Sequence, residues 1–248
     1  MKLLNEKSKT GSSSFNVSLL DIPTNIPDIL QRTGLNLPEL PEVEVVRHYT
    51  TLSKSNFGVD NGPYPLGSCT MKYNPKINEI AAKIPEFNIH PLSQHNKGAL
   101  EIIYQLQQYL CDITGMHAFS TQPAAGAHGE ATGIMIMRAW FEKRGEKRTK
   151  VIIPDSAHGT NPASVSLSGF EPLQVKSSLS GGIDLDDLRQ KMNEDVVGIM
   201  ITNPNTLGIF DENILEITKT VHDHGGLCYL DGANMNAMLG IVKPANFG

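Results

Sequence analysis

The sequence has few cysteines and few aromatic residues. Only three of its 248 residues are cysteine, and Cys69, Cys111 and Cys228 are far apart, with no C-x-x-C pair among them. This number and spacing do not indicate a disulfide framework. A reducing, cytoplasmic setting fits the cysteine usage.

Long apolar runs and long basic runs are also absent. The most apolar stretches, such as residues 133–141, are interrupted by charge and fall short of the ~20 residues that a membrane span requires. The formal net charge is −5, and no run of Lys and Arg is long enough to follow a phosphate backbone. We therefore expect neither a membrane nor a nucleic acid as partner.

Composition along the chain predicts three parts. Residues 1–34 are expected to form a mobile tail, because Gly11 to Ser14 stand where a signal peptide would have an apolar region. Residues 35–95 are rich in Pro, Gly and Asn, with helical periodicity only over Glu42 to Leu52, which predicts an extended arm over the active site. Residues 96–248 carry the regular apolar patterns of a large domain.

The large domain begins with two predicted helices. In the first, apolar residues recur at helical spacing before Gly115, which predicts an amphipathic, half-buried helix. Its apolar positions are Leu100, Ile103, Leu106, Leu110 and Ile113. The second is expected to run from about Gly126 to Phe141.

Strands and helices then alternate. The predicted strands are Val151 to Ile153, Leu173 to Val175, Val196 to Thr202 and Leu227 to Leu230, and the predicted helices lie near Ala163, over Leu185 to Met192 and over Ile214 to His222. This order indicates an α/β fold with a mostly parallel sheet that has helices on both faces. Ligands of such sheets bind at the carboxyl ends of the strands.

The first feature at that edge is a run of small residues, Ala125 to Glu130, at a helix start. Small residues let backbone N–H groups approach an anion, and the helix dipole favours negative charge there. A phosphate is therefore one interpretation. A glycine-rich turn before an ordinary helix is the other.

The second feature is His158, in the loop Asp155 to Pro162 that follows a predicted strand. An aromatic ring on such a loop can stack on a cofactor ring, and neighbouring Ser and Thr hydroxyls can reach the substituents of that ring. A surface or capping histidine is the alternative.

The third feature is Asp231, a carboxylate at a strand end with small neighbours. A buried carboxylate requires a cationic partner, and a protonated pyridine nitrogen would be one. The alternative is a residue that caps a helix beginning near Asn234.

These three features lie in the order used by pyridoxal-phosphate enzymes of the aspartate aminotransferase fold. Four blocks of the sequence resemble the family of glycine dehydrogenase (decarboxylating) subunit 2. They are Leu40 to Tyr49, Tyr64 to Lys76, Asp155 to Pro162 and Thr202 to Gly208. The resemblance extends from about Leu35 to Gly248 and implies an incomplete pyridoxal-phosphate-dependent transferase large domain of fold type I, the N-terminal half of the family's protein.

The resemblance also implies roles for individual residues. Asp231 would pair with the pyridine nitrogen of pyridoxal 5'-phosphate, and His158 would stack on its ring. The other implied cofactor contacts are Ala125, Gly126, Ala127, Thr206 and Ala233, and the implied glycine contacts are Ser68, Cys69, Lys72 and Tyr73.

By the same resemblance, the reaction is decarboxylation of glycine with transfer of the aminomethyl group to the lipoyl group of a carrier H-protein. The implied partners are that lipoylated protein and glycine dehydrogenase subunit 1, in a heterotetramer. No metal is expected, because His222 and His224 have no suitably spaced third ligand.

One required residue of the family has no counterpart here. The family's Schiff-base lysine lies in a His-Lys-Thr motif, and this sequence contains none. Lys72, Lys176 and Lys243 are poor substitutes by position, so activity of this chain alone is not expected. A non-catalytic partner or remnant is the alternative function, and another fold type I enzyme is a weaker one, because the Gly67 to Pro75 block argues against it.

Overall fold

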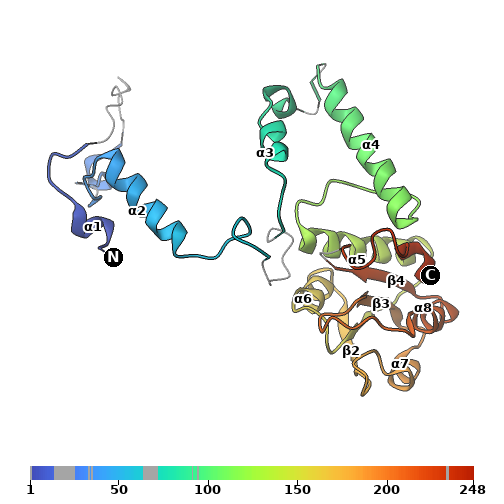
Figure 1. The fold of residues 1–248 in the computed structure, drawn as a ribbon. Coiled ribbons are helices and arrows are strands. Elements are labelled where there is room, and N and C mark those ends of the chain that lie inside the picture. Colours follow the sequence, from blue (N-terminus) through green and yellow to red (C-terminus); the bar gives the residue numbers. More distant parts are fainter. Residues whose placement is uncertain are drawn as a thin grey trace. The chain divides into compact units, whose positions relative to one another are not determined.

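A computed structural model describes residues 2–13, 26–32, 34, 36–63, 72–90, 92–93, 95–232 and 235–248 (Figure 1). The chain divides into two compact units. The first contains the described residues up to Pro63 together with Lys72 and Tyr73, and the second contains the described residues from Asn74 onward. The division into tail, arm and large domain remains a prediction.

The first unit is mainly one helix with a folded start of the chain beside it. Its elements are α1 (Leu4–Lys7), the 3-10 turn η1 (Asp28–Leu30) and α2 (Glu42–Lys54). Helix α2 begins directly after Pro41 and contains the periodic segment identified in the sequence. The backbone carbonyl of Glu39 accepts a hydrogen bond from the N–H of Lys9, and the Glu39 side chain accepts one from the N–H of Gly11. These bonds join the start of the chain to the segment just before α2.

The second unit begins with three helical segments, α3 (Lys76–Ala82), η3 (Pro85–Asn88) and α4 (Lys97–Thr114). The first two lie in the segment expected to be extended, so that expectation is wrong there. As predicted, Gly115 ends helix α4, and its φ of 75° is left-handed. The apolar face of α4 is half buried, as predicted, since Leu100, Leu106 and Ile113 are 51%, 46% and 41% exposed.

The predicted parallel sheet is present. Its strands are β1 (Lys150–Pro154), β2 (Glu171–Val175), β3 (Val196–Thr202) and β4 (Leu227–Asp231). Their order across the sheet is β2-β1-β3-β4, and every neighbouring pair is parallel. All four strands were predicted, with boundaries within two residues of those observed.

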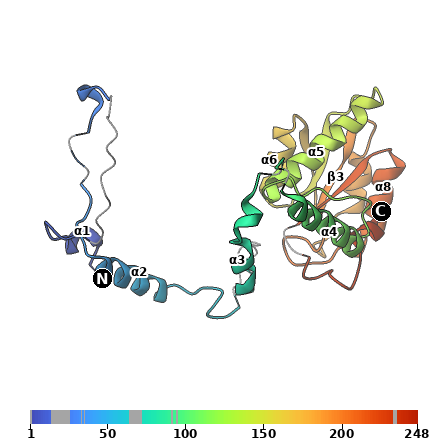
Figure 2. The ribbon, with the colours of Figure 1, turned by 90° about the horizontal axis from the view of Figure 1, so that it is seen from above.

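Helices cover both faces of the sheet, and two apolar clusters fill the layers between them (Figure 1). Helices α5 (Gly126–Lys143) and α6 (Thr160–Leu167) cover one face, where Ile134 and Val165 are fully buried. Helices α7 (Leu185–Lys191) and α8 (Ile214–Asp223) and the 3-10 turn η4 (Pro244–Phe247) cover the other, where Leu188 and Ile217 are fully buried. Figure 2 shows α5 and α6 on one side of β3 and α8 on the other.

Close strand packing explains one glycine in the sheet. A Cβ atom at Gly198 would overlap the backbone carbonyl of Leu227, so only glycine fits where β3 runs beside β4. This pairing brings the last residue of β3, Thr202, beside the last residue of β4, Asp231. Within the described residues no helix is long and apolar enough to cross a membrane.

Candidate active site

Polar side chains gather where the strands end. Pairing of β1 with β2 places Pro154 beside Val175, and pairing of β3 with β4 places Thr202 beside Asp231. Asp155, directly after β1, accepts hydrogen bonds from the backbone N–H and the hydroxyl of Ser177 after β2. These bonds hold the pKa of Asp155 below its usual value.

Asp231 is a partly buried carboxylate with an amide neighbour. Its Oδ2 accepts a hydrogen bond of 2.9 Å from Nδ2 of Asn161 on α6. Burial raises the pKa of Asp231, and the charge of Glu130 raises it further, whereas the Asn161 hydrogen bond opposes both effects. Residues 236–241 form turns, so the described structure does not show a helix there for Asp231 to cap.

Tyr229 lies between β4 and helix α5. A Cβ atom at Gly133 would fall inside van der Waals distance of the Tyr229 ring, so the ring packs directly against the α5 backbone. The hydroxyl group reaches toward Gly129, one turn earlier in α5. Burial, together with the charges of Asp231 and Glu130, raises the pKa of Tyr229 to about 12, so the phenol stays protonated.

The predicted phosphate site is at the start of α5. Ala125 is the N-cap, with extended φ and ψ of −156° and 170°, and Gly126 begins the helix. Ala125, Gly126 and Ala127 are all exposed, and no atom lies within 4 Å of the position of a Cβ on Gly126. The start of the helix is therefore exposed, and no side chain packs on Gly126.

His158 is held by a chain of hydrogen bonds that leads into the interior. Its Nδ1 lies 2.7 Å from Oγ1 of Thr160, and Thr160 Oγ1 lies 2.7 Å from Oε1 of Glu130. Glu130 Oε2 accepts a 2.8 Å hydrogen bond from the Ser164 hydroxyl. The Thr160 backbone N–H also lies 3.2 Å from Nδ1, so the capping alternative for His158 is partly realised. The residue itself is exposed, which leaves its ring accessible.

Thr206 is exposed in the loop that follows β3. The loop is organised by Asn205, whose side-chain oxygen accepts hydrogen bonds from the backbone of Leu207 and Ile209. The Asn205 side-chain amide donates to the carbonyl of Gly181. Thr206 thus lies in a hydrogen-bonded turn at the same edge of the sheet as Asp231.

Some predicted site residues are not brought into this cluster. Ser68, Cys69 and Ala233 lie outside the described residues. Lys72 and Tyr73 belong to the first compact unit, so their roles remain predictions. Lys176 follows the edge strand β2, where its backbone N–H donates to Asp187, and Lys243 packs against Gly115 at the end of α4.

The structure adds five residues to the cluster that the sequence did not single out. They are Glu130, Thr160, Asn161, Ser164 and Tyr229. Glu130, Thr160 and Asn161 lie within the motifs used for the prediction, but the Glu130–Thr160 and Asn161–Asp231 bonds join residues 30 and 70 positions apart along the chain. The spacing of residues in the sequence therefore could not predict these contacts.

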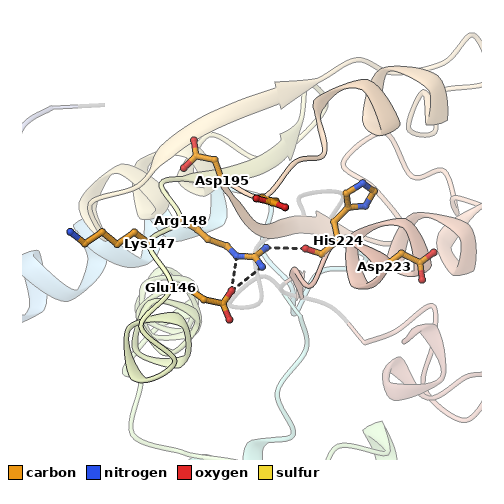
Figure 3. Close-up of a pocket in the computed structure, with 7 residues that line it drawn as sticks. Glu146, Lys147, Arg148, Asp195, Asp223 and His224 are labelled. Atoms are coloured by element: carbon orange, nitrogen blue, oxygen red, sulfur yellow. Dashed lines mark hydrogen bonds and ion pairs between the residues drawn. The ribbon is translucent and has the colours of Figure 1, made fainter.

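A charged pocket lies at the opposite, amino-terminal edge of the sheet (Figure 3). Its lining residues come just before β1, β3 and β4, and are Glu146, Lys147, Arg148, Glu194, Asp195, Asp223 and His224. Arg148 binds Glu146 at 3.0 Å and donates to the carbonyls of Val196 and His224 at 2.9 and 3.1 Å. These contacts tie three elements together. No group of three or more possible metal ligands occurs among the residues that the structure describes.

Solved structures define the class of the fold. A crystal structure of glycine decarboxylase (P-protein) of the glycine cleavage system, in inhibitor-bound form, matches with a TM-score of 0.65 and 20% identity, covering 82% of this chain and 46% of that one. Sphingosine-1-phosphate lyase from Burkholderia pseudomallei matches with a TM-score of 0.56 and 13% identity, covering 78% and 48%. The chain has the fold of part of the large domain of pyridoxal-phosphate enzymes of fold type I, as predicted.

Known sequences give the particular family. The chain is 51% identical over 99% of its length to the probable glycine dehydrogenase (decarboxylating) subunit 2 of Caldanaerobacter subterraneus subsp. tengcongensis, and 53% identical over 99% to that of Staphylococcus aureus. The predicted relation to this subunit is thus confirmed. The chain spans about half the length of these curated relatives, 53% and 52% respectively. No family model matches the chain.

Proposed function

We propose that this chain is a cofactor-binding part of a glycine dehydrogenase (decarboxylating) and that it binds pyridoxal 5'-phosphate at the carboxyl edge of its sheet. One observation carries the proposal. A partly buried carboxylate, Asp231, lies at the end of β4 with an amide neighbour and no cation bound to it among the described residues. A protonated pyridine nitrogen would complete its surroundings.

The residues present fit the cofactor. The side-chain oxygens Asn161 Oδ1 and Thr202 Oγ1 are buried at this edge, and neither has a hydrogen-bond partner in the described part of the chain. Buried polar atoms without partners are rare in proteins, and they mark places where a ligand or water can donate. The start of α5 is exposed and no side chain packs on Gly126, which is consistent with a phosphate there.

Each group then has a role that its position supports. The first amides of α5, at Gly126 and Ala127, would bind the phosphate, where the helix dipole favours negative charge. The exposed ring of His158 would stack on the pyridine ring, with Thr206 beside it. Ala233 is proposed as a further cofactor contact, from the resemblance alone.

Asp231 would keep the cofactor nitrogen protonated. Burial raises the pKa of Asp231, but a cationic nitrogen within hydrogen-bond distance favours the ionised carboxylate and lowers that pKa again. Bound pyridoxal 5'-phosphate supplies an electron sink for the loss of carbon dioxide from glycine. Ser68, Cys69, Lys72 and Tyr73 are proposed to contact the glycine.

The partners follow from the same relation. We propose that the complete assembly transfers an aminomethyl group to the lipoyl group of a carrier H-protein and contains glycine dehydrogenase subunit 1 in a heterotetramer. A cytoplasmic setting belongs to this proposal and is supported by the separated cysteines. Because the sequence contains no His-Lys-Thr motif, the chain alone is expected to bind the cofactor without catalysing the reaction.

A hybrid enzyme tests the catalytic part of the proposal. In the C. subterraneus relative, the half that this chain matches is replaced by this chain, and release of carbon dioxide from carboxyl-labelled glycine is measured with subunit 1 and lipoylated carrier. The proposal expects activity that Asp231→Asn abolishes. A folded hybrid that binds cofactor but releases no carbon dioxide would favour the alternative function, a non-catalytic partner or remnant.

Borohydride reduction tests the expectation for the chain alone. The purified chain is incubated with pyridoxal 5'-phosphate, reduced and examined by intact mass and peptide mapping. Scattered, substoichiometric labelling is the expected result. A single stoichiometric adduct on one lysine, such as Lys72, Lys176 or Lys243, would show that the chain contains its own Schiff-base residue.

A further inference from the structure

We infer that Glu130 is a positioning residue, which sets the orientation and the tautomer of the His158 ring through the hydroxyl of Thr160. The inference rests on the proposed function insofar as His158 meets the cofactor ring. It gives a role to the buried carboxylate of Glu130, which cofactor binding does not itself require.

Glu130 is one of the most enclosed charged groups of the second unit. The residue is 6% exposed and lies in the second turn of α5. Both of its carboxylate oxygens are used, since Oε1 faces the Thr160 hydroxyl at 2.7 Å and Oε2 faces the Ser164 hydroxyl at 2.8 Å. Both hydroxyls belong to α6, so the carboxylate joins the start of α6 to α5.

Counting protons determines the direction of the hydrogen bonds. The Thr160 hydroxyl has one proton but lies 2.7 Å from both Glu130 Oε1 and His158 Nδ1. If the hydroxyl donates to the ionised carboxylate, its oxygen can only accept from the ring, so the proton of a neutral His158 is on Nδ1. The Thr160 backbone N–H also points at Nδ1, at the longer distance of 3.2 Å, and a proton on Nδ1 would displace this weaker hydrogen bond.

This arrangement leaves Nε2 of a neutral His158 unprotonated, as an acceptor on the exposed side of the ring. Without Glu130 or the hydroxyl, the backbone N–H of residue 160 can donate to Nδ1 and place the proton on Nε2 instead. The carboxylate therefore selects one of two tautomers, and it also restricts rotation of the ring over the cofactor site.

Nuclear magnetic resonance of the full chain, labelled with ¹⁵N at histidine, tests the inference directly. Long-range ¹H–¹⁵N spectra distinguish the protonated ring nitrogen from the unprotonated one, at a pH where the ring is neutral. His158→Gln assigns the signal among the eight histidines. The expected result is a proton on Nδ1 in the natural chain and on Nε2 in Thr160→Val and Glu130→Leu.

Two matched variants separate positioning from general damage. Glu130→Gln keeps an oxygen that can accept from Thr160, so it is expected to retain the proton on Nδ1. Glu142→Gln, on the same helix but exposed, is expected to leave the spectrum of His158 unchanged. Thr160→Val preserves shape, so it remains informative if Glu130→Leu does not fold. A proton on Nε2 in the natural chain, or on Nδ1 in a folded Thr160→Val chain, would overturn the inference.

Cofactor affinity provides a second, independent measurement. Thr160→Val is expected to weaken binding of pyridoxal 5'-phosphate about tenfold, the effect of losing roughly one hydrogen bond. If the natural chain shows the Nδ1 tautomer but binds no cofactor, the proposed function is wrong and the assignment of Glu130 stands. If it binds cofactor and Thr160→Val binds equally well, Glu130 does not position His158 for the cofactor.

Discussion

Asp231 combines partial burial with a carboxylate, and this combination has a consequence for stability. Because burial raises its pKa in the folded chain, the folded chain holds a proton that the unfolded chain releases as pH rises above about 4. The stabilisation is fully present below the unfolded pKa and is lost as pH rises through the folded pKa.

Asp231→Asn is expected to remove this pH-dependent loss of stability. Between the unfolded and folded pKa values of Asp231, the free energy of unfolding of the natural chain falls as pH rises. The variant is expected to show a shallower fall and a higher free energy of unfolding at neutral pH. Urea unfolding across the acidic range measures this. Asp155→Asn is the control of opposite sign, because hydrogen bonds from Ser177 lower the Asp155 pKa and its contribution is lost as pH falls. Equal shifts for the two variants would contradict the account.

The contact between Tyr229 and α5 gives a second prediction at this scale. Gly133→Ala places a methyl group inside van der Waals distance of the Tyr229 ring and is expected to lower the free energy of unfolding by about 1–3 kcal/mol. Gly126→Ala, on the same helix, meets no atom within 4 Å and is expected to change stability by less than about 1 kcal/mol. Chemical denaturation of both variants checks the pair, and equal losses would place the Tyr229 ring elsewhere.

At the scale of single residues, the sequence identified Asp231, His158 and the start of α5, because each belongs to a local motif. It could not identify Glu130 or Asn161 as their partners, since those contacts depend on how α5, α6 and β4 pack together. Partial burial of Asp231, which determines the direction of its pKa shift, likewise comes from tertiary structure.

At the scale of elements, Arg148 ties the end of α5 to the starts of β3 and β4. Its side chain is 10% exposed, lies over the Phe141 ring at 4.4 Å and donates to the carbonyls of Val196 and His224. Arg148→Ala leaves these acceptors without their charged donor, so it is expected to lower the free energy of unfolding by about 1.5–3 kcal/mol.

Arg144 is the matched control, because it pairs with the same Glu146 but is 57% exposed. Arg144→Ala is expected to cost less than about 1 kcal/mol, as is typical of exposed ion pairs. Chemical denaturation of the two variants measures the difference. Similar losses would mean that the carbonyl contacts of Arg148 contribute little to stability.

The strands were predictable because each is a short apolar run between helical segments, and such runs have few other interpretations. Helix α3 was not predicted, because it lies among prolines and glycines whose composition indicates irregular chain. For α4, periodicity predicted the position of the helix and its half-buried apolar face, but periodicity does not reveal which element covers that face. Leu100 and Leu106 are 51% and 46% exposed, so the described part of the second unit covers this face only in part.

At the scale of the whole molecule, identity of 51–53% over nearly the full chain agrees with the family that the motifs indicate. The chain nevertheless matches only about half of each relative. Cofactor binding is therefore the part of the proposed function that can be tested with this chain alone.

Equilibrium binding of pyridoxal 5'-phosphate tests that claim most directly, with the natural chain, Asp231→Asn and the exposed control Glu142→Gln compared by isothermal titration calorimetry. We expect saturable binding of one cofactor per chain, unchanged in Glu142→Gln and weakened about 10- to 100-fold in Asp231→Asn, as the loss of a charged hydrogen bond implies. Absence of saturable binding by the folded natural chain, or equal affinity of Asp231→Asn, would contradict the claim.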